Sequence, residues 1–216
     1  MSQEVLGTLE EQIKPEHTAL VVIDPQNDFC ADDGAAAKLL ESDVSRIQRA
    51  VGPLNSFIQK ARDAGLTIVW TRSLFDPDKA RPSFKARSFM MDAKTKNIEV
   101  VREESHGSDW YPEVGKPLPD EYVITKYHYD AFEDTDLGLL LGSLGVKTML
   151  MTGCMANVCV ETTARHGYIK GYYIVLVSDC TDTITEAEYL ATLNNIKKYF
   201  SKVATSSDIT KIWDTR

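Results

Sequence analysis

Short apolar runs alternate with segments of helical periodicity along most of the chain. The apolar runs fall at residues 18–24, 66–73, 121–127, 147–153, 172–180 and 201–209, the last read as a short strand followed by a tail. Helical spacing occupies residues 43–65, 134–146, 157–171 and 186–200. Near-continuous Val/Ile/Leu runs indicate strands buried on both faces, and their alternation with helices favours parallel pairing. The pattern predicts an α/β fold with an open, mostly parallel six-stranded sheet, helices on both faces and a Rossmann-like arrangement.

The chain length and one polar segment shape the expected domain organisation. A chain of 216 residues suffices for one domain with a sizeable core, so we predict a single domain over residues 1–216. The segment 73–120 is long and polar, with few periodic runs. Because structureless loops of such length are unusual in compact domains, we expect short helices or an active-site cover there.

Charge and cysteine usage narrow the possible partners and the compartment. The formal net charge is −8 and no Lys/Arg-rich run stands out, which argues against nucleic acid or an anionic membrane as a partner. The N-terminus does not resemble a signal peptide, and no apolar run is long enough to cross a bilayer. The few irregularly spaced cysteines are typical of reduced thiols. We therefore expect a cytoplasmic protein with free cysteines at positions 30, 154, 159 and 180.

Residues that carry chemistry follow several of the predicted strands. In open parallel sheets, ligands bind beyond the carboxyl ends of the strands. Asp24 follows the first strand, Arg72 ends the second, Lys126 ends the third, and the segment GCMANVC follows the fourth. A carboxylate, an ammonium and a thiol are thus expected at one edge of the sheet.

Cys159 is the strongest candidate for a nucleophile. It falls in the first turn of the helix after the fourth strand, where unpaired N–H groups and the helix dipole favour a thiolate and are expected to lower the thiol pKa. A carboxylate can take the thiol proton, and an ammonium can orient that carboxylate and stabilise charge. Cys154 ends the strand itself and is expected to be a core residue.

Metal binding and a Cys–His dyad are both disfavoured by spacing. A Cys-x4-Cys pair without a second pair is not a zinc-site spacing, and the four histidines form no metal-ligand pattern. His166 lies seven residues after Cys159, about 10 Å along a helix axis, which is too far for direct proton transfer. We expect no metal and no cofactor.

Three segments together resemble the isochorismatase-like cysteine hydrolase superfamily: ALVVIDPQNDF, KYHYDAFEDTDL and TGCMANVCVETTARHGY. The resemblance spans residues 18–208, which we take as the core. It implies hydrolysis of small amides by an Asp24–Lys126–Cys159 triad. It also implies a cis peptide at Cys154–Met155 and an oxyanion hole formed by the backbone N–H groups of Met155 and Cys159.

The superfamily contains several chemistries, and the sequence favours one of them. Nicotinamidases carry a metal site with histidines after the second strand, whereas WTRSLFDPDKARPSF contains none. Isochorismatases proper often lack the cysteine. The stretch HGSDWYPEVGKPLPDEYVITKYHYDAF looks most like the branch that acts on ureidoacrylate, biuret or N-carbamoyl amino acids. We expect an amidohydrolase that cleaves a small linear amide or N-carbamoyl compound through a thioester and releases ammonia. The alternatives are a nicotinamidase-type or isochorismatase-type hydrolase, or a catalytically silent ligand-binding member.

The sequence also suggests residues that bind the substrate and an assembly of several copies of the chain. The candidates to line the pocket are Arg72, Trp110, Tyr129 and Asn157. An arginine at the end of the second strand suits a bidentate pair with a substrate carboxylate, unless Arg72 pairs with Asp76 or Asp130 instead. The resemblance implies homodimers or homotetramers. Apolar residues in predicted loops agree with a covered surface, namely Phe29, Phe89, Met90 and Met91.

Overall fold

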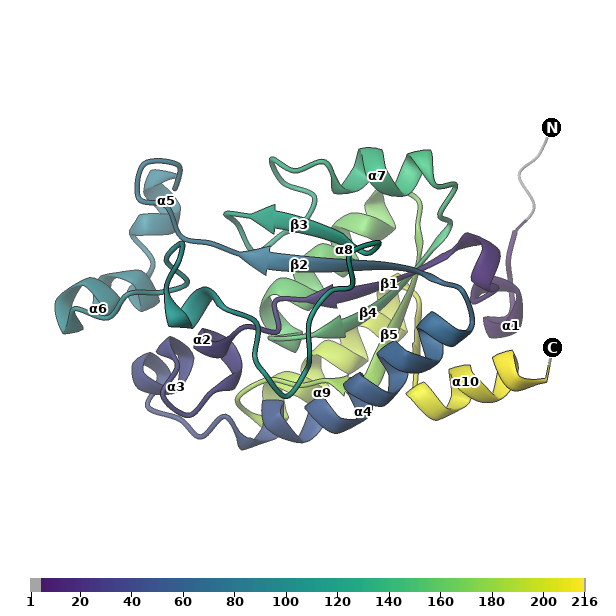
Figure 1. The fold of residues 1–216 in the computed structure, drawn as a ribbon, viewed down its shortest axis with the longest axis horizontal. Coiled ribbons are helices and arrows are strands. Elements are labelled where there is room, and N and C mark those ends of the chain that lie inside the picture. Colours follow the sequence, from purple (N-terminus) through teal and green to yellow (C-terminus); the bar gives the residue numbers. More distant parts are fainter. Residues whose placement is uncertain (1–4, 216) are drawn as a thin grey trace.

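The computed structural model describes residues 5–215 and has an open, all-parallel sheet as its centre (Figure 1). Residues 1–4 and 216, which the predicted domain includes, lie outside the described part. The sheet order is β3-β2-β1-β4-β5-β6, and every pairing is parallel. The predicted α/β fold is confirmed, with strands β1 Thr18–Ile23, β2 Thr67–Ser73, β3 Tyr122–Lys126, β4 Thr148–Gly153, β5 Tyr173–Thr181 and β6 Lys202–Ala204.

Helices cover both faces of the sheet and divide the core in two. One apolar cluster joins the sheet to α4 (Ser45–Asp63) and α10 (Ser206–Asp214), and the other joins it to α7 (Leu137–Ser143) and α8 (Glu161–Ile169). In Figure 1, α7 lies on one side of the sheet and α4 and α10 lie on the other. The remaining helices are α1 Leu9–Gln12, η1 Pro15–His17, α2 Asn27–Cys30, α3 Ala35–Leu40, α5 Pro82–Lys85, α6 Ser88–Lys96, η2 His106–Ser108, η3 Ala156–Val160, α9 Glu186–Asn195 and η4 Ile196–Phe200.

The strand order creates a crevice between β1 and β4. Connections from β1 lead outward to β2 and β3, whereas β4, β5 and β6 lie on the other side of β1. At such a switch point the two connecting loops diverge, and ligands bind there beyond the carboxyl ends of the strands. Asp24 follows β1 directly, and the loop that leads to Cys159 follows β4. The topology therefore places the carboxylate and the thiol on the two sides of one crevice.

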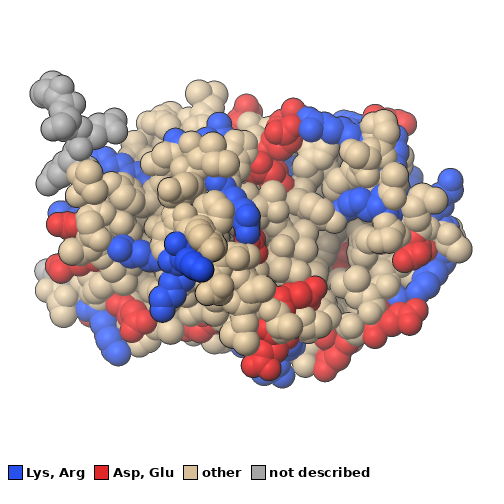
Figure 2. All heavy atoms as spheres, turned by 180° about the vertical axis from the view of Figure 1, so that it is seen from behind, with Lys and Arg blue, Asp and Glu red and all other residues tan. Residues whose placement is uncertain are grey.

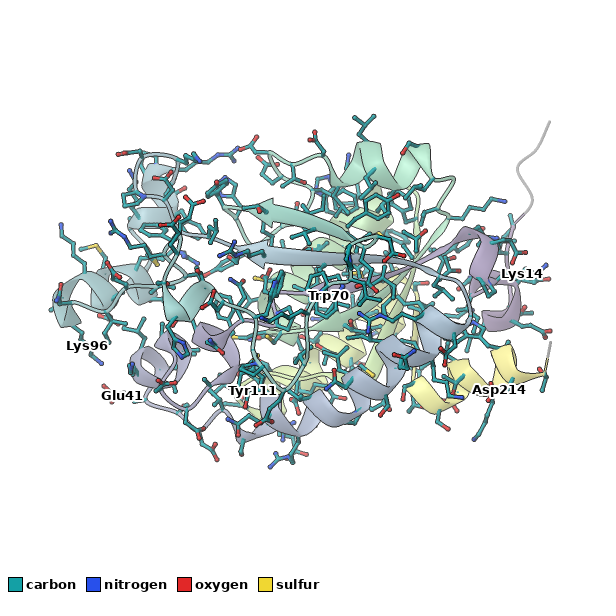
Figure 3. The ribbon with its side chains drawn as sticks, viewed as in Figure 1. Lys14, Glu41, Trp70, Lys96, Tyr111 and Asp214 are labelled. Atoms are coloured by element: carbon teal, nitrogen blue, oxygen red, sulfur yellow. The ribbon has the colours of Figure 1, made fainter. Side chains whose placement is uncertain are left out.

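The segment 73–120 contains the short helices α5, α6 and η2, as its length predicted. These helices lie beyond the carboxyl ends of β2 and β3, at the end of the molecule opposite to α1 and α10 (Figure 1). Helix α6 packs on α3 through a small apolar cluster of its own. An ion pair of 2.8 Å between Lys96 and Glu41 joins the same two helices at their ends (Figure 3).

The apolar residues that were expected in loops are mostly packed inside. Met90 lies in α6 and is 8% exposed, while Phe29 and Phe89 are partly buried against the cluster between α3 and α6. Only Met91, at 50%, is largely exposed. The four residues were predicted to form an exposed apolar surface that a partner could cover; for Phe29, Phe89 and Met90 this prediction is wrong, because they pack between helices.

Two features of the surface bear on possible partners. No helix in residues 5–215 combines the length and apolarity that a bilayer crossing needs. On the face seen in Figure 2, basic and acidic side chains are interspersed rather than gathered by sign.

The C-terminal tail was wrongly predicted. A strand and tail were expected over residues 201–209, but β6 ends at Ala204 and α10 begins at Ser206. Thr205 caps this helix, since its hydroxyl accepts from the Asp208 N–H and the Asp208 carboxylate accepts from the Thr205 N–H. A Thr-x-x-Asp pattern of this kind marks a helix start in sequence. The helix is held further by Trp213, which stacks on Phe57 with ring centroids 5.6 Å apart.

We predict that Thr205→Ala lowers the free energy of unfolding by about 1 kcal/mol, because a helix N-cap is worth roughly that much. Chemical denaturation followed by circular dichroism measures the change. Ser207→Ala is the matched control, since Ser207 is exposed in the same turn and its hydroxyl makes no hydrogen bond to a described residue. Equal stability of wild type and Thr205→Ala would contradict a capping role.

Candidate active site

Asp24 is fixed at the crevice by its backbone and by a neighbouring strand. It has a left-handed backbone with φ of 45°, a conformation that aspartate tolerates better than most residues. The Thr71 hydroxyl donates to Asp24 Oδ1 at 2.6 Å. The side chain of Asp24 has no exposed surface. Its carboxylate is therefore held in one orientation, away from water.

Lys126 reaches this carboxylate from two strands away. It ends β3, the edge strand, and pairs in register with Ser73 at the end of β2. The separation of β3 from β1 is about 10 Å, which the long, flexible stem of a lysine helps to cross. The Lys126 ammonium lies 2.7 Å from Asp24 Oδ2, donates to the His128 carbonyl at 2.9 Å and donates to Cys159 Sγ at 3.4 Å. One buried ammonium thus contacts both the carboxylate and the thiol.

The contact between Lys126 and Asp24 is a buried ion pair. Apart from this contact, no described residue donates a hydrogen bond to Asp24 Oδ2. Burial alone would lower the pKa of Lys126, but the negative charge of Asp24 and, once it ionises, the Cys159 thiolate outweigh burial, and the pKa is raised. The ammonium therefore stays protonated at neutral pH.

A close approach of β1 and β4 positions Cys159. Gly153 has φ of +93°, and a Cβ there would lie 2.1 Å from the Ile23 carbonyl oxygen, so that only glycine fits. The peptide bond that follows, Cys154–Met155, is cis. Cys159 then lies in η3, a π-helical turn that leads into α8, and its side chain is buried. The loop after β4 thus directs the thiol toward the end of β3.

The Cys159 thiol is protonated, contrary to the expectation from its place at a helix start. Burial raises its pKa to about 12; the Lys126 charge lowers the pKa, and the Asp24 carboxylate raises it. Loss of hydration therefore outweighs the effect of the ammonium. The resting site holds a neutral thiol beside a carboxylate and an ammonium.

A cavity of about 370 Å³ opens onto Cys159. Of the predicted pocket residues, Tyr129 and Asn157 line it. The Asn157 amide oxygen accepts from the Thr183 hydroxyl at 2.6 Å, which fixes the orientation of that side chain. Arg87, which lies between α5 and α6, also lines the cavity.

The structure does not bring Arg72 and Trp110 to the cavity. The Arg72 guanidinium donates to the carbonyl and the hydroxyl of Ser108, and it pairs with neither of the acidic residues considered for it. Trp110 packs edge-on against Trp70, which lies near the middle of the sheet (Figure 3). Arg72 thus holds η2 through Ser108, and Trp110, just after η2, packs against β2.

The other cysteine of the loop and the neighbouring histidine have different partners. Cys154 is buried in the core, donates to the Asp24 carbonyl at 3.2 Å and lies 3.5 Å from Cys30, sulfur to sulfur. The His166 ring pairs with Asp130. No group of three or more His, Cys, Asp or Glu side chains within residues 5–215 is arranged to hold a metal ion.

The family model for the isochorismatase domain matches residues 18–208 of this chain. The chain belongs to the isochorismatase family. It is 31% identical over 204 residues to a protein named ureidoacrylate amidohydrolase RutB from Enterobacter sp. (strain 638), covering 90% of this chain and 88% of the relative.

Solved structures of the family share the fold. A cysteine hydrolase from Pseudomonas syringae pv. phaseolicola 1448A superposes with a TM-score of 0.80 at 23% identity, covering 100% of this chain and 99% of the other. N-carbamoylsarcosine amidase from Thermoplasma acidophilum has a TM-score of 0.69 at 24% identity, covering 88% of this chain and 96% of the other. At these identities the likeness concerns the fold.

Two residues of this candidate active site were not identified from the sequence. Thr71 was assigned no role from the sequence, yet its hydroxyl holds Asp24. The strand pairing supplies the missing signal, because Thr71 is in register with Ile23, immediately before Asp24. Arg87 carries no motif and lies in a segment without periodicity, so that only the folded structure reveals its place.

We predict that iodoacetamide alkylates Cys159 slowly at pH 7 and that the rate rises about tenfold per pH unit up to pH 10, because only the thiolate reacts. With a pKa of about 12 the thiolate fraction is still growing over this whole range. Peptide mass spectrometry of the alkylated native protein measures the rate. The Cys159→Ser variant, which lacks this thiol, is the control that shows the adduct forms at position 159. A rate that is already maximal at pH 7 would contradict a protonated thiol.

Proposed function

We propose that this chain is an amidohydrolase that uses Cys159 as its nucleophile, Asp24 as its general base and acid, and Lys126 as the group that holds both. The observation that carries the proposal is the buried cluster in which one ammonium lies 2.7 Å from the carboxylate and 3.4 Å from the sulfur. The family and the printed name of the Enterobacter relative, an amidohydrolase, support the same chemistry. The substrate is a small linear amide or N-carbamoyl compound.

The first half of the reaction forms a thioester. Asp24 takes the thiol proton as Cys159 Sγ attacks the carbonyl carbon, and the carbonyl electrons move onto the oxygen. Asp24 Oδ2, which has no hydrogen-bond donor, offers a lone pair for that proton. Asp24 then passes the proton to the leaving nitrogen, the C–N bond breaks, and ammonia departs. A protonated resting thiol fits this order, because the proton is removed only when the substrate is attacked.

The oxyanion is stabilised by backbone N–H groups of the loop after β4. The Met155 N–H donates to no group of the described residues, and Cys159 lies in the first turn of η3, where N–H groups lack intrahelical partners. Each such donor contributes on the order of 100-fold to the rate when it is aimed at the developing charge. The Lys126 ammonium adds positive charge beside the sulfur.

The second half of the reaction releases the acid. Water attacks the thioester carbon while Asp24 takes one of its protons, and the tetrahedral intermediate collapses with cleavage of the C–S bond. Asp24 returns its proton to the departing sulfur, which restores the neutral thiol. Throughout, Lys126 balances the charge of Asp24 at a buried position, where an unpaired carboxylate would be costly.

We predict that Cys159→Ala lowers ammonia release by at least about 1,000-fold, because loss of a nucleophile removes the covalent route. Cys154→Ala is the matched control and keeps most of the activity, since that sulfur lies in the core, where it contacts Cys30 and the backbone carbonyl of Asp24. A coupled ammonia assay over a panel of small amides and ureas gives the measurement. An inactive Cys154→Ala beside an active Cys159→Ala would overturn the assignment of the nucleophile.

We predict that activity survives dialysis against EDTA, because a thiol, a carboxylate, an ammonium and backbone N–H groups supply every step described above. The assay compares turnover of the same preparation before and after chelation, and after addition of zinc or manganese. Loss of activity on chelation with recovery on adding metal would favour a nicotinamidase-type, metal-assisted reaction instead.

A further inference from the structure

Arg87 holds an unneutralised positive charge at the wall of the cavity that contains Cys159. Its guanidinium carbon lies 3.4 Å from the ring centroid of Phe84 and 4.4 Å from that of Tyr129. Of its nitrogens, only Nε donates a hydrogen bond to a described residue, to the Phe84 carbonyl at 3.0 Å. Nη1 is buried and has no partner. Two rings thus fix the guanidinium in place and leave part of its donor edge free.

No carboxylate of residues 5–215 forms an ion pair with Arg87. Burial lowers its pKa to about 10, which is still well above neutral, so Arg87 remains a cation at neutral pH. A partly buried cation with an unpaired donor is unfavourable unless an anion neutralises it. Planar guanidinium groups bind carboxylates by two parallel hydrogen bonds.

The rest of the cavity wall is largely apolar. Most of the side chains that line it are hydrocarbon, aromatic or thioether groups, among them Phe29, Leu40, Phe75, Phe89, Met90 and Ile184. Among the described residues, Glu188 is the only other charged one that lines it; it is exposed and accepts a hydrogen bond from the Thr185 hydroxyl. At about 370 Å³ the cavity has room for more than a minimal amide and carboxylate. Its wall suits a branched aliphatic or aromatic group.

We infer that Arg87 binds the carboxylate of the substrate, and that the apolar wall holds a hydrocarbon body attached to it. The substrate is then an amide acid or N-carbamoyl amino acid with an apolar side chain, rather than a neutral amide or a bare ureido acid. This inference rests on the proposed function for the cleavage itself, which takes place at Cys159. The specificity comes from the segment between α5 and α6, outside the residues that perform the bond cleavage.

The first experiment compares matched anionic and neutral substrates. N-carbamoyl-leucine and N-carbamoyl-phenylalanine are the anionic probes, and isopentylurea and phenethylurea have the same skeletons without the carboxylate. N-carbamoyl-glycine lacks the apolar body. We expect the wild type to prefer the two apolar carbamoyl acids over the glycine derivative and over both ureas, measured as kcat/KM for ammonia release.

Variants of Arg87 then separate charge from packing. Arg87→Met keeps an apolar stem between the rings and should lower kcat/KM for the carbamoyl acids at least tenfold, mainly through KM, with less than about threefold change for the ureas. Arg87→Gln provides a second uncharged variant, and Arg87→Lys should restore part of the lost preference. Lys85→Met removes an exposed positive charge from the adjacent α5 and should leave all rates unchanged. Equal losses on acids and ureas would mean that Arg87 only packs the cover, and would overturn the inference.

Binding to Cys159→Ala distinguishes failure of this inference from failure of the proposed function. Calorimetry with N-carbamoyl-leucine on that variant, with and without Arg87→Met, reports the anion site without turnover. If the wild type releases no ammonia but Arg87-dependent binding is present, the anion site stands and the proposed function fails. If ammonia is released but neither binding nor kcat/KM depends on Arg87, the function stands and the anion site is wrong. Absence of any Arg87-dependent binding or turnover also overturns the inference.

Discussion

The ion pair between Asp24 and Lys126 is the interaction on which the arrangement of the site depends. Both side chains are fully buried, and burial of each ion costs several kcal/mol unless its charge is compensated. Besides the attraction between the two ions, two further residues compensate the charges: Thr71 donates to the carboxylate, and the His128 carbonyl accepts from the ammonium. Removal of either ion would leave an uncompensated buried charge, typically at a cost of 3–5 kcal/mol. The pair therefore ties the edge strand β3 to the central strand β1.

The same pair determines the state of the thiol. Cys159 lies in a site where the ammonium and the carboxylate act on its pKa in opposite directions, and the remaining influence is burial, which keeps the proton on sulfur. A neutral thiol is a poor nucleophile toward stray electrophiles. In the proposed reaction it becomes reactive only when a bound substrate offers its carbonyl carbon and the nearby carboxylate takes the proton. Low resting reactivity is thus compatible with the proposed catalytic role.

The chemistry and the recognition are divided between two parts of the structure. The groups at the strand ends are held by the parallel sheet, whose register fixes their positions. Beyond the loop after β4, the cavity wall comes largely from α3, the segment 73–101 and the loop after β5, which contribute apolar side chains and Arg87. Side chains on such connecting segments can change without disturbing the sheet. The shape and charge of the cavity can in this way change while the groups at the strand ends stay in place.

The sequence by itself determined the parallel sheet and the positions of the groups at its edge. Apolar periodicity is a local signal, and the carboxyl ends of parallel strands meet in space whatever the loops do, so that Asp24, Lys126 and Cys159 were expected together. The helix α10 was missed although its Thr205 cap is equally local, because the apolar run before it was extended too far. Thr71 and Asp24 form a contact that only the strand register reveals.

Only the tertiary structure decided which arginine meets the cavity and whether the thiol is ionised. Arg72 and Arg87 are indistinguishable as residue types, but the direction of a side chain depends on how distant segments pack. Arg72 donates hydrogen bonds to Ser108, whereas Arg87 is held between Phe84 and Tyr129 at the cavity wall. The pKa of Cys159 likewise follows from the loss of water around it, which is a property of the whole packed site. Periodicity and spacing carry no information on either.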